Sequence, residues 1–553
     1  MQKTSWPWVF LILILSFFSF KSLLRPGYFP MHDDMQAMRV LQMDKCVKDG
    51  QIPCRWVPDM GYEYGYPQFI FYSPLPYYVM EGFHLLGFSF LDSVKAGFAL
   101  SFILSGLTMF LLGKALWGNL GGFISAIFYI YAPYRASDAF SRGAVGEFWA
   151  LVFLPLIAWS ILELIRKEKI RYLIFLSFSF AGLLITHNLT VIAFTPVAVL
   201  WGIFLLWYYK KWRLFTKLFL GSLLGFGLAS FFVLPLFFER KFVHIETMTM
   251  GYFNFLAHFV SLRQIFLSTF WGYGSSELGP YDDLSFSIGI WHWLLALLVL
   301  IISFLKRKRE TIFSFILFFF LIFLGSCFMA HQNSVFIWNS LPFMKYFQFP
   351  WRFLTIATFA VCTIVGAIIP LTKGKKNKIF LSTLLVLVVI LFNAFYFNPS
   401  SWYNLTDKDK FSGELWEKQL TISIFDYLPI FAQSPPVSKA PEIPLLISGE
   451  AEILNYQKGT DWQRGKVFVT ETAVLRLPLY YFPGFKVWID GRESMIDYHN
   501  DLGLITVSVP PGEHEIYVKL KRTWPRAAGD FLTIVSLILV VVILYENRHK
   551  KDL

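Results

Sequence analysis

Charged residues and cysteines are scarce in this chain of 553 residues. Asp, Glu, Lys and Arg make up 16% of it and four residues are cysteine, whereas 56% are hydrophobic. Four cysteines are too few for a disulfide-rich scaffold. The low charge content, together with a mean hydropathy of +0.53, excludes a soluble globular protein. The chain is therefore expected to lie in a lipid bilayer.

Several motifs of well-understood chemistry are also missing. The sequence contains no P-loop, no G-x-G-x-x-G turn, no H-E-x-x-H zinc motif and no Ser–His–Asp pattern. The function therefore has to be sought in the distribution of polar residues between the apolar runs.

Long apolar runs recur along the whole chain, and runs of about 17–25 residues are long enough to cross about 30 Å of hydrocarbon. The first run carries Lys21 and Arg25 at its far end and no small-residue cleavage site, so we interpret it as a retained anchor. We predict a polytopic α-helical membrane protein with about twelve transmembrane helices, at residues 5–23, 92–113, 119–134, 147–165, 172–187, 189–208, 215–237, 287–305, 311–330, 352–371, 378–397 and 527–545.

The net charge of +12 is a topology signal, because the basic residues gather between the apolar runs. With twelve crossings, the basic clusters at 166–171, 210–213, 306–309, 373–378 and 548–551 all fall on one side. The positive-inside rule makes that side the cytoplasm, with both termini there. We expect a multi-pass protein of the plasma (inner) membrane that contacts anionic lipid and binds no nucleic acid.

The chain divides into a membrane unit at 1–397, an outer domain at 398–526, and a last helix with a basic tail at 527–553. Residues 466–493 and 503–520 alternate apolar and polar side chains and are broken by Pro-Gly, Asp-Gly and Pro-Pro-Gly turns. This pattern predicts hairpins, which we expect to form a small extracytoplasmic β-sandwich. A lid, an acceptor-recognition module and a structural cap are all open as its role.

The first outer loop, 24–91, opens with His32, Asp33 and Asp34, followed by Gln36 and Arg39. Spacing alone fits a helix N-terminus with solvated acids as well as it fits a site. The same loop contains further polar and aromatic residues that are typical of sugar-binding clefts and also of interfacial belts. These residues are Arg55, Trp56, Asp59, Glu63, Tyr64, Tyr66, Tyr72 and Tyr78.

The second outer loop, 135–146, contributes Arg135, Asp138 and Arg142, and Glu147 begins the next apolar run. Asp138 and Arg142 are four residues apart, which fits an ordinary helical ion pair. An arginine here could also clamp a phosphate through its planar fork. A lone carboxylate at the start of a span is costly without a partner, so we favour a functional role for this loop.

Other polar residues lie at the outer mouths of the apolar runs. His187 most simply makes a local hydrogen bond, and Glu239 and Arg240 most simply form an ion pair that caps a span. Arg352 follows Pro350 and Trp351, which fix its entry geometry and favour a phosphate contact at membrane depth over snorkelling. A Gly-rich outer loop carries further acids at Glu277, Asp282 and Asp283.

The four cysteines fall into two pairs. Cys46 and Cys54 share the first outer loop, and the pattern leaves a disulfide and two free thiols equally open. Cys327 and Cys362 lie in apolar runs and are expected to be packing residues.

Together, these residues carry a resemblance to a family. The order of one span, an acidic first outer loop, a second loop with acid and Arg, and many more spans resembles the GT-C integral membrane glycosyltransferases. The β segment, with "YYFPGFKVWIDGRE" and "VPPGEHEI", resembles the outer domain of YfhO-like proteins. The membrane unit is similar to bacterial and archaeal membrane proteins labelled 6-pyruvoyl-tetrahydropterin synthase-related, without any sign of pterin chemistry, through "HDD", "DGQIPCRW", "FYSPLPYY", "YAPYR", "RGA", "THN", "LPLFFER" and "FQFPWRFL".

The resemblance implies an inverting transfer of a sugar from a polyprenyl-phosphate donor to a cell-envelope acceptor outside the membrane. Asp33 would be the general base, with Asp34 as neighbour or substitute. Arg142 and Arg352, with Arg135 behind them, would bind the lipid phosphate. The predicted substrate-binding set is His32, Arg135, Asp138, Arg142, Glu147, His187 and Arg352.

Some GT-C enzymes hold a divalent cation such as Mg²⁺ or Mn²⁺, which here would engage Asp33, Asp138 and Glu147; others use none, and a D-x-D spacing is missing. Two other functions are weighed: a transporter or flippase of lipid-linked saccharides, and a non-catalytic envelope scaffold. The enzyme interpretation makes a geometric prediction. Asp33, Asp138, Arg142 and Arg352 should converge on one outward-facing cavity.

Overall fold

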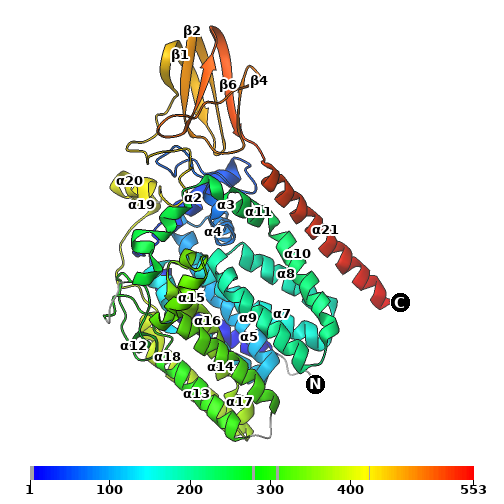
Figure 1. The fold of residues 1–553 in the computed structure, drawn as a ribbon. Coiled ribbons are helices and arrows are strands. Elements are labelled where there is room, and N and C mark those ends of the chain that lie inside the picture. The colour runs from blue at the N-terminus through cyan, green and yellow to red at the C-terminus, as the bar shows by residue number, and fades with distance from the viewer. Residues whose placement is uncertain (1–4, 277–280, 307–309, 423, 553) are drawn as a thin grey trace.

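The computed structural model describes residues 5–276, 281–306, 310–422 and 424–552. Most of the chain is helical, and an antiparallel sheet stands beyond one end of the helices (Figure 1). The long helices of the membrane unit are α1 (Trp6–Phe20), α5 (Phe90–Ile130), α7 (Val145–Lys167), α8 (Ile170–Leu184), α9 (Asn188–Tyr208), α10 (Phe215–Leu228), α11 (Ser230–Glu239), α13 (Ile290–Leu305), α14 (Glu310–Ala330), α16 (Leu354–Val365) and α18 (Lys375–Asn393).

Eight described helices are long and apolar enough to cross a membrane, or nine if α10 and α11, which are bent by 75°, form one span. This number is smaller than the twelve predicted, although every predicted run overlaps a described helix. Two runs form the short apolar helices α8 and α13, and two lie within the single long helix α5. The number of crossings therefore stays a prediction.

Helix α5 contains a reversal of direction. Gly118 adopts φ +80° in the middle of it, a conformation that glycine reaches without strain. A Cβ added to Gly113 would lie 2.8 Å from the Cα of Gly122, whereas nine residues of straight helix would separate them by about 13 Å. The two halves of α5 therefore pack against each other as a helical hairpin, which matches the two runs predicted there.

The first outer loop folds over the membrane helices as α2 (Gln36–Lys48), α3 (Gln68–Phe71) and α4 (Leu75–Leu85). Cys46 and Cys54, whose pairing the sequence left open, form a disulfide. The two apolar-run cysteines, Cys327 and Cys362, are buried and free, as expected.

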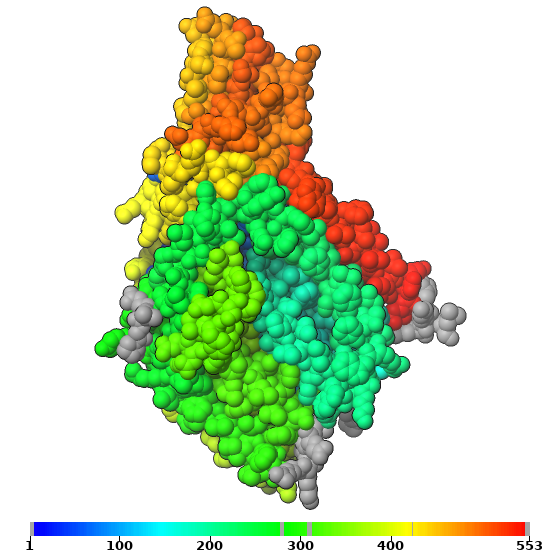
Figure 2. All heavy atoms as spheres, viewed as in Figure 1, coloured from blue at the N-terminus to red at the C-terminus, as the bar shows by residue number. Residues whose placement is uncertain are grey.

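The segment between the membrane helices and the sheet packs on this loop through α19 (Asp407–Lys410) and α20 (Gly413–Ile422). The amide of Tyr62 donates to the carbonyl of Leu420 at 3.2 Å, and the amide of Ala440 donates to the carbonyl of Tyr62 at 3.0 Å. In the view of Figure 2, this segment and the membrane helices cover nearly all of the first loop. The loop thus lies between the membrane helices and the sheet, in contact with both.

The outer domain contains one six-stranded sheet, where the sequence predicted a sandwich of two. The first half of β2 pairs with β6 and its second half with β5, so all strands join a single hydrogen-bonded sheet. Aromatic residues of the first loop, including Trp56 and Phe71, pack against the buried face that a second sheet would cover. The strands are β1 (Leu445–Lys458), β2 (Trp462–Tyr480), β3 (Phe485–Ile489), β4 (Arg492–Ser494), β5 (Leu504–Val509) and β6 (Gly512–Leu520), in the order β1-β2-β6-β3-β4.

The last helix, α21 (Trp524–Asp552), leaves the sheet and runs along α10 and α11 (Figure 1). Arg526 at its start donates to Glu239 of α11 at 2.9 Å, and both side chains are buried. The predicted Glu239–Arg240 pair is therefore wrong. Arg240 lies over the ring of Phe237 instead, because Glu239 points to the helix that anchors the sheet.

Candidate functional site

A cavity of about 560 Å³ lies where the first outer loop meets the N-terminal ends of α7 and α9 and the residues that lead into α16. Six of the predicted site residues line it: His32, Asp33, Arg142, Glu147, His187 and Arg352. They come from segments up to 320 residues apart in sequence. Asp34, Arg135 and Asp138 do not belong to its wall.

Asp33 is held at the cavity wall by side chains of its own loop. Arg39 Nη1 lies 2.8 Å from both carboxylate oxygens, Gln36 donates at 3.0 Å, and the Tyr72 hydroxyl donates at 3.2 Å. One third of the Asp33 side chain stays exposed. These contacts fix the direction of the carboxylate and leave part of it open to the cavity, as a positioned base requires.

The backbone places Asp33 beside the second outer loop. Its amide donates to the carbonyl of Arg142 at 3.0 Å, and the amide of His32 donates to that of Ser141 at 3.0 Å. The helix-cap alternative is wrong, because α2 begins after Met35 and no side chain caps it.

Asp34 has a different partner. It accepts from Lys410 of α19 at 2.7 Å, and Lys410 is buried. This contact joins the first loop to the segment before the sheet. The structure therefore gives Asp34 a docking contact where the sequence treated it as a substitute for Asp33.

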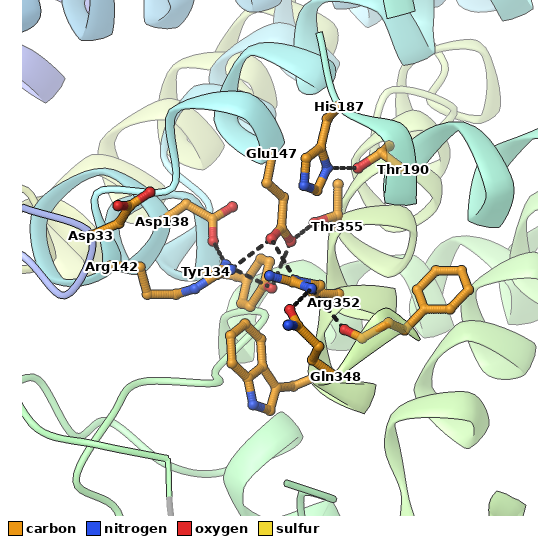
Figure 3. A network of polar contacts seen from close by, with 12 residues as sticks. Asp33, Tyr134, Asp138, Arg142, Glu147, His187, Thr190, Gln348, Arg352 and Thr355 are labelled. Carbon is orange, nitrogen blue, oxygen red and sulfur yellow. Dashed lines mark hydrogen bonds and ion pairs between the residues drawn. The ribbon is translucent and has the colours of Figure 1, made fainter. Parts of the chain in front are cut away.

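The second outer loop forms a buried ionic network around Arg142 (Figure 3). Its guanidinium pairs with Asp138 through Nη1 and with Glu147 at 2.7 Å through Nη2, and it lies 4.1 Å from the ring centroid of Trp351. Burial, together with the nearby Glu147 carboxylate, raises the pKa of Asp138 well above its ordinary value. The local ion pair that the spacing suggested thus forms, and it extends to Glu147.

The loop conformation brings these groups together. Residues Ser137–Arg142 form one π-helical turn, a local geometry frequent at functional sites. Gly143 follows with φ +61°, and a Cβ there would lie 2.3 Å from the sulfur of Met31. The turn starts α7 immediately, so that Glu147 falls in its first turn, where the helix dipole favours an anion.

Arg352 lies on the other side of Glu147, with its Nε 3.7 Å from the carboxylate (Figure 3). Its Nη1 donates to the carbonyl of Phe347 at 2.7 Å and to Gln348 at 3.1 Å. Its buried Nε has no hydrogen-bond partner among the described residues. Glu147 also accepts from Tyr134 at 3.0 Å and Thr355 at 2.5 Å, so this carboxylate is fully engaged. Arg39, which also lines the cavity, has an Nε unpaired within the described part of the chain as well, but it is bound to Asp33; Arg352 keeps donor capacity without holding that carboxylate.

The two histidines of the cavity offer hydrogen-bonding groups to a ligand. Desolvation at the cavity wall, followed by the charge of Arg142, lowers the pKa of His32 to about 4, so His32 adds no positive charge near pH 7. The Nδ1 of His187 lies 2.7 Å from the hydroxyl of Thr190. The local hydrogen bond expected of His187 is present.

Arg135 is fully buried away from the cavity, contrary to the expected phosphate contact. It donates to the carbonyl of Tyr129 at 2.9 Å and to Ser105 at 2.7 Å, and its guanidinium lies about 5 Å from the rings of Phe102 and Phe148. Burial lowers the pKa of Arg135 to about 10. These contacts are those of a packing residue that holds the second loop on α5.

The proposed metal ligands do not fit a divalent cation. Asp138 and Glu147 both pair with Arg142, and Asp33 pairs with Arg39. A cation would have to displace these guanidinium groups from the carboxylates that it needs. In the part of the chain that the structure describes, no three Asp, Glu, His or Cys residues stand close enough to hold a metal.

The cavity contains one acid that sequence reasoning missed, and the acids predicted in the Gly-rich loop are not shown to line it. Asp426, which follows α20, lines the cavity near Arg39, and burial raises its pKa to about 6. It is 393 residues from Asp33, and no local pattern marks it. Of the Gly-rich loop, Glu277 lies outside the described residues, and Asp282 accepts from Ser268 at 2.6 Å without lining the cavity.

No protein-family model matches the chain. A curated protein of Lactococcus lactis subsp. cremoris (strain MG1363), itself described as uncharacterized, is 25% identical over 227 residues, which cover 39% of this chain and 35% of that protein. The mycobacterial arabinofuranosyltransferase AftD gives a TM-score of 0.43 at 12% identity, covering 73% of this chain and 28% of that one.

The Archaeoglobus fulgidus oligosaccharyltransferase, solved with a tethered acceptor peptide, gives a TM-score of 0.41 at 10% identity, covering 72% of this chain and 56% of that one. The chain thus spans about a third of its curated relative and 28% and 56% of the two solved chains. Because both TM-scores are below 0.5, these likenesses do not establish the fold or the activity. We therefore infer the function from the residues of the cavity.

Proposed function

We propose that this chain is a membrane glycosyltransferase of the GT-C kind, which moves a sugar from a polyprenyl-phosphate donor to an acceptor of the cell envelope. The observation that carries the proposal is that Asp33 and Arg352 line one cavity at the ends of apolar helices. A fixed, partly exposed carboxylate and an arginine with free donors are the two groups that inverting transfer needs.

In the proposed reaction, Asp33 takes the proton of the acceptor hydroxyl as that oxygen attacks the anomeric carbon of the donor sugar. The bond between that carbon and the phosphate oxygen breaks, and the lipid phosphate leaves with the electron pair. Arg39 positions Asp33, and the guanidinium of Arg352, which lines the cavity, faces the developing negative charge. Arg142 keeps Glu147 occupied, so the carboxylate does not repel the phosphate as a free anion would.

We further propose that the chain crosses the plasma membrane twelve times with both ends in the cytoplasm. This orientation puts the cavity and the sheet on the extracytoplasmic side, where the lipid tail of the donor stays in the bilayer beside α7 and α9. The hairpin in α5 and the apolar character of α8 and α13 support this count.

The test compares two adjacent acids in a transfer assay with a radiolabelled polyprenyl-phosphate sugar and the purified protein in lipid. Asp33→Asn removes the base, and we expect transfer to fall by about 10²–10⁴-fold. Asp34→Asn is the matched control, because it removes only the contact with Lys410, and it should keep most of the turnover.

Equal turnover by wild type and Asp33→Asn would show that Asp33 is not the general base. If donor moves between leaflets of a vesicle at the wild-type rate in both variants while no sugar is transferred, the chain is a transporter of lipid-linked saccharides.

A further inference from the structure

The sheet carries a groove that is separate from the cavity described above. It has a volume of about 500 Å³ and lies on the sheet face opposite the core. Its wall contains the aromatic residues Trp462, Trp488 and Tyr517, the polar residues Gln457 and Lys519, and the ion pair of Arg464 with Glu515. None of them lines the Asp33 cavity.

The strand register aligns these side chains in rows. Gln457 pairs with Arg464, Arg464 with Tyr517, and Tyr517 with Trp488, so one row crosses β1, β2, β6 and β3. Trp462 and Lys519 form the next row. Because side chains alternate across a strand, all of these share one face.

The aromatic rings on this face are half-buried, and they pack beside one another. The ring centroids of Trp488 and Tyr517 are 5.6 Å apart and the ring planes are inclined by 30°, so the two rings stack. The Lys521 ammonium lies 5.1 Å from the Trp488 centroid, which places a positive charge beside the rings. Alternate residues of the same strands, such as Val467 and Val518, form the core on the opposite face. The rings are therefore not needed to fill the core.

The first outer loop braces one end of the groove. The indole N–H of Trp462 donates to Asp49 at 3.0 Å, and Asp49 also accepts from the amide of Thr460 at 2.7 Å. Lys519 donates to Asp461 at 2.7 Å. These bonds fix the ring and the ammonium before any ligand arrives, which lowers the entropic cost of binding.

A basic pocket of about 440 Å³ continues the groove toward the start of α21, and Lys519 belongs to both. The five basic side chains of its wall face three carboxylates, those of Asp461, Asp530 and Glu239. Asp49, which holds Trp462 beside Lys519, is a fourth carboxylate here, so one positive charge remains unbalanced. The basic side chains are Arg55, Lys519, Lys521, Arg522 and Arg526.

We propose that this continuous surface binds an acidic saccharide chain of the cell envelope. The sugar rings stack on Trp488, Tyr517 and Trp462, because aromatic faces bind the C–H faces of pyranoses and the flanking polar groups take their hydroxyls. The carboxylate or phosphate groups of the chain face Lys521 and Arg522, where the excess positive charge lies. Binding here does not depend on the transfer proposed for the other cavity.

The test measures binding of three probes to the full chain in lipid nanodiscs by calorimetry. The probes are hexagalacturonate (acidic rings), cellohexaose (neutral rings) and hexametaphosphate (charge without sugar). Wild type should bind hexagalacturonate saturably and more tightly than cellohexaose or hexametaphosphate. Trp488→Ala should weaken hexagalacturonate by about 10-fold through loss of one ring contact, and Lys521→Gln with Arg522→Gln should abolish the preference for the acidic probe.

Phe468→Ala is the matched control, because Phe468 is an exposed aromatic residue of β2 outside the groove. Phe468→Ala should bind hexagalacturonate as wild type does. Asp33→Asn should also bind it as wild type does, and this result would separate saccharide binding from the transfer reaction. No saturable binding of hexagalacturonate to wild type would overturn the proposal. So would equal affinity for the three probes, or an equal loss in Phe468→Ala and Trp488→Ala.

Discussion

Asp33 and Asp34 are adjacent in sequence and have different chemical surroundings. Asp33 is bound by Arg39, Gln36 and Tyr72 and faces the cavity, whereas Asp34 reaches Lys410 of a segment that comes much later in the chain. At the scale of single residues, the role of a carboxylate thus depends on which basic side chain it pairs with and on how much of it remains exposed to the cavity. The same rule separates Arg352, which keeps a free donor, from Arg142, which is occupied by two acids.

Asp426 predicts how stability depends on pH. Its folded pKa of about 6 lies above its ordinary 3.8 because of burial, so between about pH 4 and 6 the folded protein holds a proton that the unfolded chain has lost. Stability therefore falls as the pH rises through this window. Asp426→Asn should reduce that fall by on the order of 1 kcal/mol.

Thermal unfolding of the purified protein at pH 4.5 and pH 7 measures this difference. Asp501→Asn, an exposed acid, serves as the control and should behave as wild type. If Asp426→Asn shows the wild-type fall between the two pH values, the side chain is not buried in the way described.

The candidate residues near the ends of apolar runs could be predicted from the sequence, because a polar group at the end of a span must be solvated, paired with another polar group or part of a site. His32, Asp33, Arg142, Glu147, His187 and Arg352 were all visible in this way, and they line one cavity. Asp426 was not, since it follows an unremarkable stretch and meets Asp33 only through the docking of α20. The roles of these residues in transfer are predictions that the assay with Asp33→Asn tests.

At the scale of elements, close backbone packing decides whether an apolar stretch is one helix or two. The hairpin in α5 depends on Gly113 and Gly122, which allow its two halves to touch, and on the turn at Gly118. The length of the apolar runs was enough to predict the two halves of α5. The pairing of the strands in the outer domain could not be predicted from the alternation of apolar and polar residues. Alternation indicates which side chains face the core, but it does not indicate whether a second sheet or a neighbouring loop covers them.

Gly113→Val should disrupt this hairpin. The larger side chain would meet the Gly122 backbone and Ser125 at 3.0 Å or less, so that the two halves of α5 would have to separate. We expect a loss of about 1–3 kcal/mol or more of stability, as for other overpacked cores, measured as the melting temperature in detergent.

Gly325→Val in α14 is the matched control, because a Cβ there meets nothing within 4 Å. The hairpin description fails if both valine variants melt at the wild-type temperature.

At the scale of the whole molecule, the first outer loop joins the membrane helices to the sheet. Its aromatic residues complete the core of the sheet, its disulfide-closed turn supports Thr460, and Asp34 holds α19. The buried pair of Glu239 and Arg526 adds a second connection, between α11 and the helix that follows the sheet. The sheet is therefore joined to the membrane unit at two places, the first loop and α11.

Arg526→Met should destabilise this arrangement by about 3–5 kcal/mol, because it leaves the buried carboxylate of Glu239 without its partner. The double variant Glu239→Met with Arg526→Met should recover most of the loss, since no buried charge remains. Limited proteolysis between the sheet and α21, together with the melting temperature, measures both effects. Equal losses in the single and double variants would show that the two charges are not coupled.

The most direct test of the central claim is a structure of the wild-type protein in lipid with a polyprenyl phosphate bound. We expect the phosphate to lie in the cavity with Asp33, within hydrogen-bond distance of the Arg352 guanidinium. The lipid chain should extend into the bilayer beside α7 and α9. A phosphate bound at another surface, such as the basic pocket near Arg522, while the Asp33 cavity holds no lipid, would contradict it.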